Sequence, residues 1–81
     1  MPTILREGPY RFYFYSHEPN EPAHIHVDRE KATAKFWIKP VRVARNQGFG
    51  ARELRELQRI VKERRFELLK AWHGYFGPRG K

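Results

Sequence analysis

Apolar and polar residues alternate along the first half of the chain, in short segments that turn residues separate. This alternation predicts β-strands, because neighbouring side chains of a strand point to opposite faces of a sheet. The strands predicted in this way cover residues 3–7, 10–15, 23–29, 32–38 and 41–45. Pro19 and Pro22 lack backbone donors, so we expect residues 16–22 to form a surface loop. The segment Asn46-Gln47-Gly48 predicts a turn.

The pattern changes near residue 50, where apolar residues begin to recur at helical spacing. This spacing predicts one long helix that starts after Gly50 and ends at Gly74 or Gly77. Glu53 lies three residues after Gly50, as in a capping box. The apolar stripe of this helix, which must pack on the sheet, comprises Leu54, Leu57, Val61, Leu68, Trp72 and Tyr75.

These elements predict an α+β fold: a small antiparallel sheet of four to five strands packed against one long C-terminal helix. At 81 residues the chain has room for a single domain with one modest core. We place this domain at residues 1–77 and expect residues 78–81 to form a frayed C-terminal tail.

Positive charge is concentrated in the second half of the chain. Residues 1–40 hold six Lys/Arg and five Asp/Glu, whereas residues 41–81 hold eleven and four. A basic balance of this kind indicates an anionic partner, although net charge alone also suits a solubilising surface. RNA is the favoured partner. The candidate nucleic-acid-binding residues lie on the last strand and the helix: Arg42, Arg45, Arg52, Arg55, Arg59 and Lys62.

Composition also excludes several classes of protein. The chain has no cysteine, which excludes disulfides and thiolate chemistry. No apolar run approaches the roughly 20 residues that a membrane-spanning helix needs. The N-terminus lacks the basic-then-apolar layout of a signal peptide. We therefore expect a cytoplasmic protein with no membrane partner.

Two histidines lie two residues apart on the third predicted strand. Strand alternation places His24, His26 and Asp28 on one sheet face. Histidine exchanges protons near neutral pH, and two histidines about 6.5–7 Å apart along a strand can bracket a phosphate. The pattern suits a metal-independent ribonuclease in which His24 and His26 are the catalytic base and acid. Lys35, Arg42 or Arg45 would then stabilise the charge on the phosphate.

Two other interpretations of this face stay open. His24 and His26, with a carboxylate from Asp28, Glu18 or Glu21, are the residue types of a two-His-one-carboxylate metal site, but the spacing does not favour one, and we expect no cofactor. Alternatively, the protein is a non-enzymatic module that binds nucleic acid or protein. A dimer is a further expectation, for two reasons. An aromatic surface lies on the same face, made by Tyr13, Tyr15 and Trp37. Residues 41–45 also form an edge strand that could pair with another chain.

Several segments together resemble a known group. They are Met1-Pro2-Thr3-Ile4, Glu21-Pro22-Ala23-His24-Ile25-His26-Val27, Phe36-Trp37-Ile38, Ala44-Arg45-Asn46-Gln47-Gly48-Phe49 and Trp72-His73. From Met1 to Phe76 the chain is similar to the small bacterial proteins classed as domain of unknown function 4160. The resemblance implies a toxin–antitoxin component whose partner is a small cognate protein from a neighbouring gene. It implies no catalytic role for any particular residue.

Overall fold

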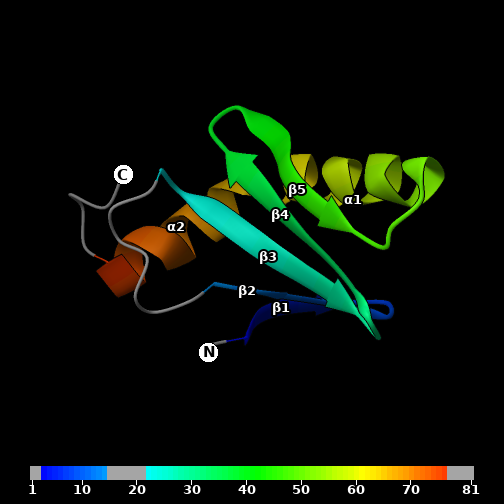
Figure 1. Ribbon diagram of the computed structural model, residues 1–81. Coiled ribbons are helices and arrows are strands. Elements are labelled where there is room, and N and C mark those ends of the chain that lie inside the picture. Colours follow the sequence, from blue (N-terminus) through cyan, green and yellow to red (C-terminus); the bar gives the residue numbers. More distant parts are fainter. Residues whose placement is uncertain (1–2, 15–21, 77–81) are drawn as a thin grey trace.

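The computed structural model describes residues 3–14 and 22–76, and within them a five-stranded sheet carries both helices on one side (Figure 1). The strands are β1 (Thr3–Glu7), β2 (Tyr10–Tyr13), β3 (His24–Arg29), β4 (Ala32–Ile38) and β5 (Val41–Gln47). Each strand pairs antiparallel with the next one in the sequence, so the sheet order is β1-β2-β3-β4-β5. The helices are α1 (Ala51–Glu63) and α2 (Arg65–Phe76). The predicted α+β class is confirmed.

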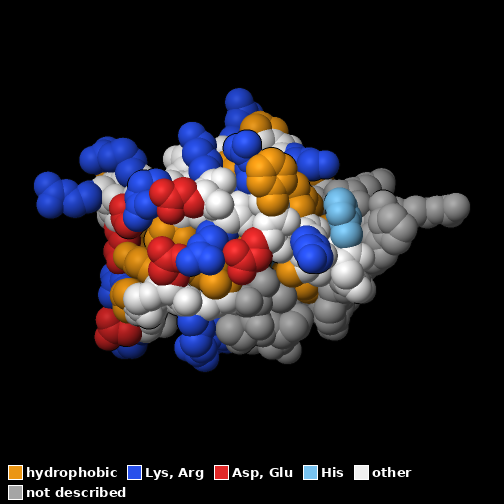
Figure 2. Space-filling view, turned by 180° about the vertical axis from the view of Figure 1, so that it is seen from behind, with side chains coloured by type: hydrophobic (Ala, Val, Ile, Leu, Met, Phe, Trp, Pro, Cys, Tyr) orange, Lys and Arg blue, Asp and Glu red, His pale blue; other side chains and the backbone are white. Residues whose placement is uncertain are grey.

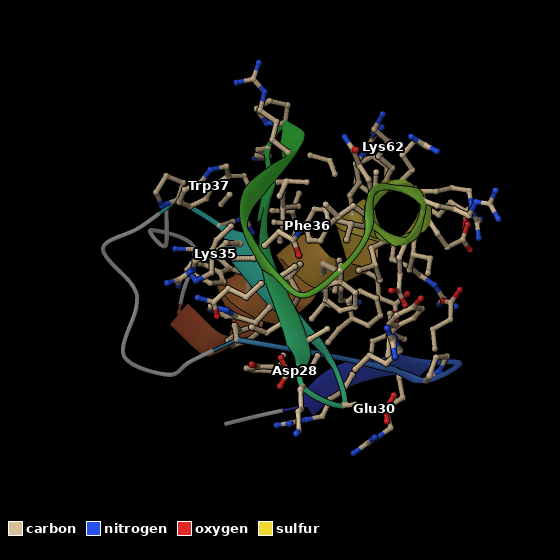
Figure 3. The ribbon with its side chains drawn as sticks, turned by 45° about the vertical axis from the view of Figure 1, so that its right-hand side comes forward. Asp28, Glu30, Lys35, Phe36, Trp37 and Lys62 are labelled. Carbon is tan, nitrogen blue, oxygen red and sulfur yellow. The ribbon has the colours of Figure 1, made fainter. Side chains whose placement is uncertain are left out.

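The sheet has one face toward the helices and one face away from them. Phe12, Val27 and Phe36 project toward the helices and are fully buried in the core. On β4, Figure 3 shows Phe36 pointing toward the helix side, whereas Lys35 and Trp37 point the other way. We call this second side, which faces away from α1, the open face, although its residues Tyr13, His24, His26 and Lys35 are at most 9% exposed. The helix residues buried in the core are Leu57, Ile60, Val61, Leu68 and Trp72.

The prediction of one long helix is wrong, because the helix is interrupted at Arg64. The backbone of Arg64 departs from helical values, with φ −103° and ψ 10°. Its guanidinium donates hydrogen bonds to Glu7 of β1 (3.0 Å) and to Glu67 (3.2 Å). The break lets α2 follow the sheet to its other end, where Trp72 contacts Phe14. Neither described helix is long and apolar enough to cross a membrane.

The strand predictions are close to the structure, and the main difference lies at the end of β5. Asn46 and Gln47, expected in a turn, continue the pairing with β4 instead. The turn follows at Gly48, whose φ of +104° suits glycine and where a Cβ would lie 3.2 Å from Ala32. The Asn46 side chain accepts a hydrogen bond from the Phe49 amide and donates one to its carbonyl. Tyr15, most of the 16–22 loop and the 78–81 tail lie outside the described residues.

Glu53 does not complete a capping box with Gly50, which has no side-chain cap. Instead, Arg29 of β3 donates two hydrogen bonds to the Glu53 carboxylate, at 2.6 and 3.0 Å, and the Tyr10 hydroxyl donates a third at 2.7 Å. These bonds, from Arg29 first and Tyr10 second, hold the pKa of Glu53 below its ordinary value of 4.5. Glu53 therefore ties the first turn of α1 to the sheet.

This tie predicts a specific acid sensitivity. The lowered pKa means that the carboxylate stabilises the fold above about pH 4.5, and that this contribution is lost as the pH falls through the folded-state pKa. We expect Glu53→Gln to lower the melting temperature at pH 7 and to reduce the loss of stability on acidification. Thermal unfolding followed by circular dichroism between pH 3 and pH 7 checks this expectation.

The matched control is Glu56→Gln. Arg59 holds the pKa of Glu56 low through a hydrogen bond on the exposed side of α1, where solvent weakens the pair. We expect the Glu56 variant to change the acid profile less than the Glu53 variant does. Equal profiles would contradict the role given to Glu53.

Candidate functional site

Four side chains from four neighbouring strands form one row across the open face. Tyr13 of β2 pairs with His26 of β3, His26 pairs with Lys35 of β4, and Lys35 pairs with Arg45 of β5. Directly paired residues of antiparallel strands project from the same face, so the four side chains lie side by side. We call them the cross-strand row. They line a cavity of about 170 Å³ together with Thr33, Ala34 and Gln47.

His26 is held in this row by aromatic contacts. Its ring stacks on the Tyr13 ring, with 5.4 Å between centroids and 19° between planes. Tyr13 is itself fixed, because its hydroxyl donates a hydrogen bond to Asp28 (3.0 Å) and the Arg11 guanidinium lies 4.5 Å from its ring centroid. Tyr13 is only 3% exposed, so it supports His26 rather than offering a free ring to a base.

His24 shares the face with His26 but does not line the cavity. It is fully buried, with its ring centroid 4.9 Å from that of Trp72 and 5.9 Å from that of Trp37. Its Nδ1 lies 2.9 Å from the Pro22 carbonyl oxygen, which only accepts hydrogen bonds, so Nδ1 is the protonated nitrogen. The structure therefore brings one of the two predicted catalytic histidines to the cavity and holds the other in a packed position.

Two cations complete the row. Lys35 is 9% exposed, and its Nζ lies 4.7 Å from the centroid of the half-buried Trp37 ring. Arg45 is exposed, and no carboxylate in the described part of the chain pairs with it. Arg42 pairs with Trp37 across the β4–β5 ladder and adds a further cation to the same face. The described lining of the cavity therefore includes two cations, Lys35 and Arg45, and a histidine.

The remaining predicted nucleic-acid-binding residues lie elsewhere. Arg52, Arg55, Arg59 and Lys62 are on α1, across the sheet from the cavity. Figure 3 shows Lys62 and Lys35 on opposite sides of β4. Arg59 is also engaged in ion pairs with Glu56 and Glu63, which raise the pKa of its guanidinium. The core-facing stripe of α1 turns these cations outward, so the basic helix and His26 do not meet.

The open face shows no metal site within the described residues. His24, His26 and Asp28 share it, but no three His, Asp or Glu groups in residues 3–14 and 22–76 come together to hold an ion. Asp28 accepts the Tyr13 hydrogen bond and lies 4.0 Å from the Arg11 guanidinium. Glu18 and Glu21, the other two candidate carboxylates, lie outside the described residues.

The roles of several residues were not evident from the sequence. Thr33 and Gln47 line the cavity and add a hydroxyl and an amide to it. Both lie next to the row in the β4–β5 ladder, where they pair with each other. Only the strand register, which places every second residue of each strand on the open face, could have indicated them.

Comparison with known proteins identifies a family for this chain. A family model described as Domain of unknown function (DUF4160) matches residues 10–73, a range that includes all four residues of the cross-strand row. Searches of the curated proteins and of the solved structures found no match.

Proposed function

The chain belongs to the family described as Domain of unknown function (DUF4160), and we propose that it binds single-stranded RNA through the open face of its sheet. One backbone phosphate occupies the cavity beside the cross-strand row. The observation that supports this proposal most strongly is the row itself, in which Lys35 and Arg45 stand beside His26 around one small cavity.

The lining of the cavity suits a phosphate group. The seven lining residues that belong to the described part of the chain include two cations and no carboxylate. Phosphate oxygens accept hydrogen bonds, and a guanidinium such as that of Arg45 can donate two of them in parallel. Lys35 supplies a second charge from a largely buried position, where water screens it less than at an exposed site. A phosphate diester therefore meets both charge and hydrogen-bond donors.

Single-stranded RNA fits the surroundings of the cavity better than a duplex does. Proteins that bind single strands combine cations that follow the backbone with aromatic rings on which bases stack. Trp37 is half-buried on the open face, and Arg42 pairs with it. Thr33 and Gln47 can hydrogen-bond the ribose 2′-hydroxyl beside the bound phosphate, a group that DNA lacks. The open face presents a sheet, and no described helix is available there to enter a groove.

Binding is favoured over cleavage because of the position of His24. Metal-free cleavage needs a base for the 2′-hydroxyl proton and an acid for the departing 5′-oxygen. Both histidines are buried, but His26 lines the cavity, whereas His24 does not. The cations of α1, which were candidates for binding the RNA backbone, also lie across the sheet from His26. They therefore cannot hold RNA in place for cleavage at His26.

Cleavage remains the second candidate function because His26 and Lys35 are direct cross-strand partners. In that reaction His26 takes the 2′-hydroxyl proton, and the 2′-oxygen attacks phosphorus. The bond to the 5′-oxygen breaks, and Lys35 gives that oxygen a proton, which leaves a cyclic phosphate. Incubating RNA with the protein in EDTA distinguishes the two functions. We expect intact RNA, whereas cleavage that His26→Ala abolishes would replace the binding proposal.

The binding proposal predicts which cations matter. We expect the double variant Lys35→Gln/Arg45→Gln to weaken the binding of a fluorescent single-stranded RNA by about 10- to 100-fold, since hydrogen bonds to charged groups contribute about 1.5–3 kcal/mol. Its affinity should also depend less steeply on salt, because fewer cations face the phosphate. Fluorescence anisotropy at several salt concentrations, with single-stranded DNA of the same sequence alongside, measures both effects.

The matched control is Arg52→Gln/Arg55→Gln, which removes the same charge from the exposed side of α1. We expect this control to lower RNA affinity much less than the first variant does. If the two double variants lose affinity equally, the cross-strand row is not the RNA site.

The toxin–antitoxin role and the small cognate protein stay predictions. Co-expression with the product of the neighbouring gene, scored by growth and by complex formation, tests both.

A further inference from the structure

A second positively charged depression lies near the end of α1, at the turn between β4 and β5. Its volume is about 500 Å³. We call it the turn–helix depression, and its lining residues are Ile38, Lys39, Pro40, Val41, Lys62 and Arg65. None of its described lining residues lines the cavity of the cross-strand row. The proposed RNA site therefore gives no role to the residues of this depression.

The cations of this depression differ from their neighbours in their pairing. Lys39, Lys62 and Arg65 are exposed, and none of them forms an ion pair with a described carboxylate. By contrast, Arg59 pairs with Glu56 and Glu63, and Arg64 pairs with Glu7 and Glu67. Three uncompensated positive charges therefore surround a depression whose lining also includes Ile38, Pro40 and Val41.

The surrounding surface suits a protein better than a nucleic acid. Acidic and basic side chains lie side by side on the helix side of the molecule (Figure 2). Phe66 is 75% exposed, with the Arg65 guanidinium 5.0 Å from its ring centroid, so an apolar ring adjoins the depression. Exposed apolar groups rimmed by charge are typical of protein interaction sites.

We propose that the turn–helix depression docks an acidic segment of a partner protein. An apolar side chain of that segment packs against the exposed Pro40; Val41 and Ile38, which are 9% and 2% exposed, add little contact surface. Carboxylates on either side of this anchor pair with Lys39, Lys62 and Arg65. Charge complementarity selects the segment, and the apolar anchor sets its register. Because the depression and the cross-strand row use different residues, this proposal does not depend on RNA binding.

An NMR titration of the ¹⁵N-labelled protein tests the proposal. The probe is a synthetic peptide with one leucine flanked on both sides by glutamate and aspartate. The control peptide carries glutamine and asparagine in place of those acids. We expect the acidic peptide alone to shift the amide signals of Lys39, Val41, Lys62 and Arg65. The signals of the cross-strand row should not move.

Charge reversal supplies the matched variants. Lys62→Glu should weaken the binding of the acidic peptide by at least about tenfold relative to Arg52→Glu. The Arg52 variant is the control, because it reverses an exposed charge on the same helix outside the depression. Thermal unfolding of both variants establishes that each is folded. The proposal is overturned if the acidic peptide leaves Lys39 and Val41 unshifted, or if both variants bind it equally. It is also overturned if single-stranded RNA shifts these signals and the acidic peptide does not.

Discussion

Replacing Trp72 with alanine is expected to lower the free energy of unfolding by about 3–5 kcal/mol, the usual cost of removing a buried tryptophan. Trp72 is fully buried, and its ring contacts Phe14 beyond the end of β2 and His24 at the start of β3. The ring therefore joins α2 to the end of the sheet next to the row. A domain of 81 residues has a total stability of about 4–12 kcal/mol, so this single change removes a large share of it.

Urea unfolding followed by circular dichroism measures the effect without relying on tryptophan fluorescence. Phe66→Ala is the matched control, because it removes an aromatic ring from the same helix at a position that is 75% exposed. We expect the control to change stability by no more than about 0.5 kcal/mol. If Trp72→Ala costs no more than this control, α2 is not held to the sheet by Trp72.

The second large effect is expected from charge reversal at Arg45. Arg45→Glu places a carboxylate at the cavity where a phosphate is proposed to bind. Like charges brought together at an interface cost several kcal/mol, so RNA affinity should fall by more than about 100-fold. Arg45 is exposed at the edge strand β5, so the fold should tolerate the change.

A graded series of reversals makes this prediction specific. Arg42 shares the open face but does not line the cavity, and Arg52 lies on α1. Fluorescence anisotropy should therefore rank the losses as Arg45→Glu largest, Arg42→Glu intermediate and Arg52→Glu smallest. An equal loss in all three variants would show that the protein attracts RNA only through its net charge.

Part of the cross-strand row follows from sequence reasoning. The Glu30-Lys31 turn joins Arg29 to Ala32, and a two-residue turn fixes the register of the strands on either side. Counting outward from this turn places Lys35 opposite His26. The alternation of β3 also correctly placed His24, His26 and Asp28 on one face, because that face is set by the two-residue period alone.

The position of Arg45 could not be obtained by the same counting. Ile38 pairs with Val41 at the β4–β5 turn, and a regular ladder would then place Ala44 opposite Lys35. The register shifts between Lys35 and Phe36, so Arg45 takes that place instead. Such an irregularity inserts one extra residue in a strand, and no glycine or proline between residues 41 and 47 indicates it. A shift of one residue therefore decides whether the cavity has its second cation.

No local sequence signal indicated the break between the helices either. Arg64 is not a glycine or a proline, and the apolar spacing continues from Val61 to Leu68. The break depends on distant contacts, because Arg64 reaches Glu7 of β1 and Trp72 packs at the far end of the sheet. The burial of His24 also depends on Trp72, which is far from it in the sequence. Local patterns thus predicted the elements, whereas contacts between elements decided which histidine faces the cavity.

The cross-strand row on the open face is the proposed RNA site. An NMR titration with a short single-stranded RNA tests it most directly, read out on the side-chain signals of His26, Trp37 and the arginine Nε–H groups. We predict that His26, Trp37 and Arg45 shift together while Arg52 and Arg55 stay unchanged. Shifts at Arg52 and Arg55 with unchanged His26 and Arg45 signals would contradict the claim.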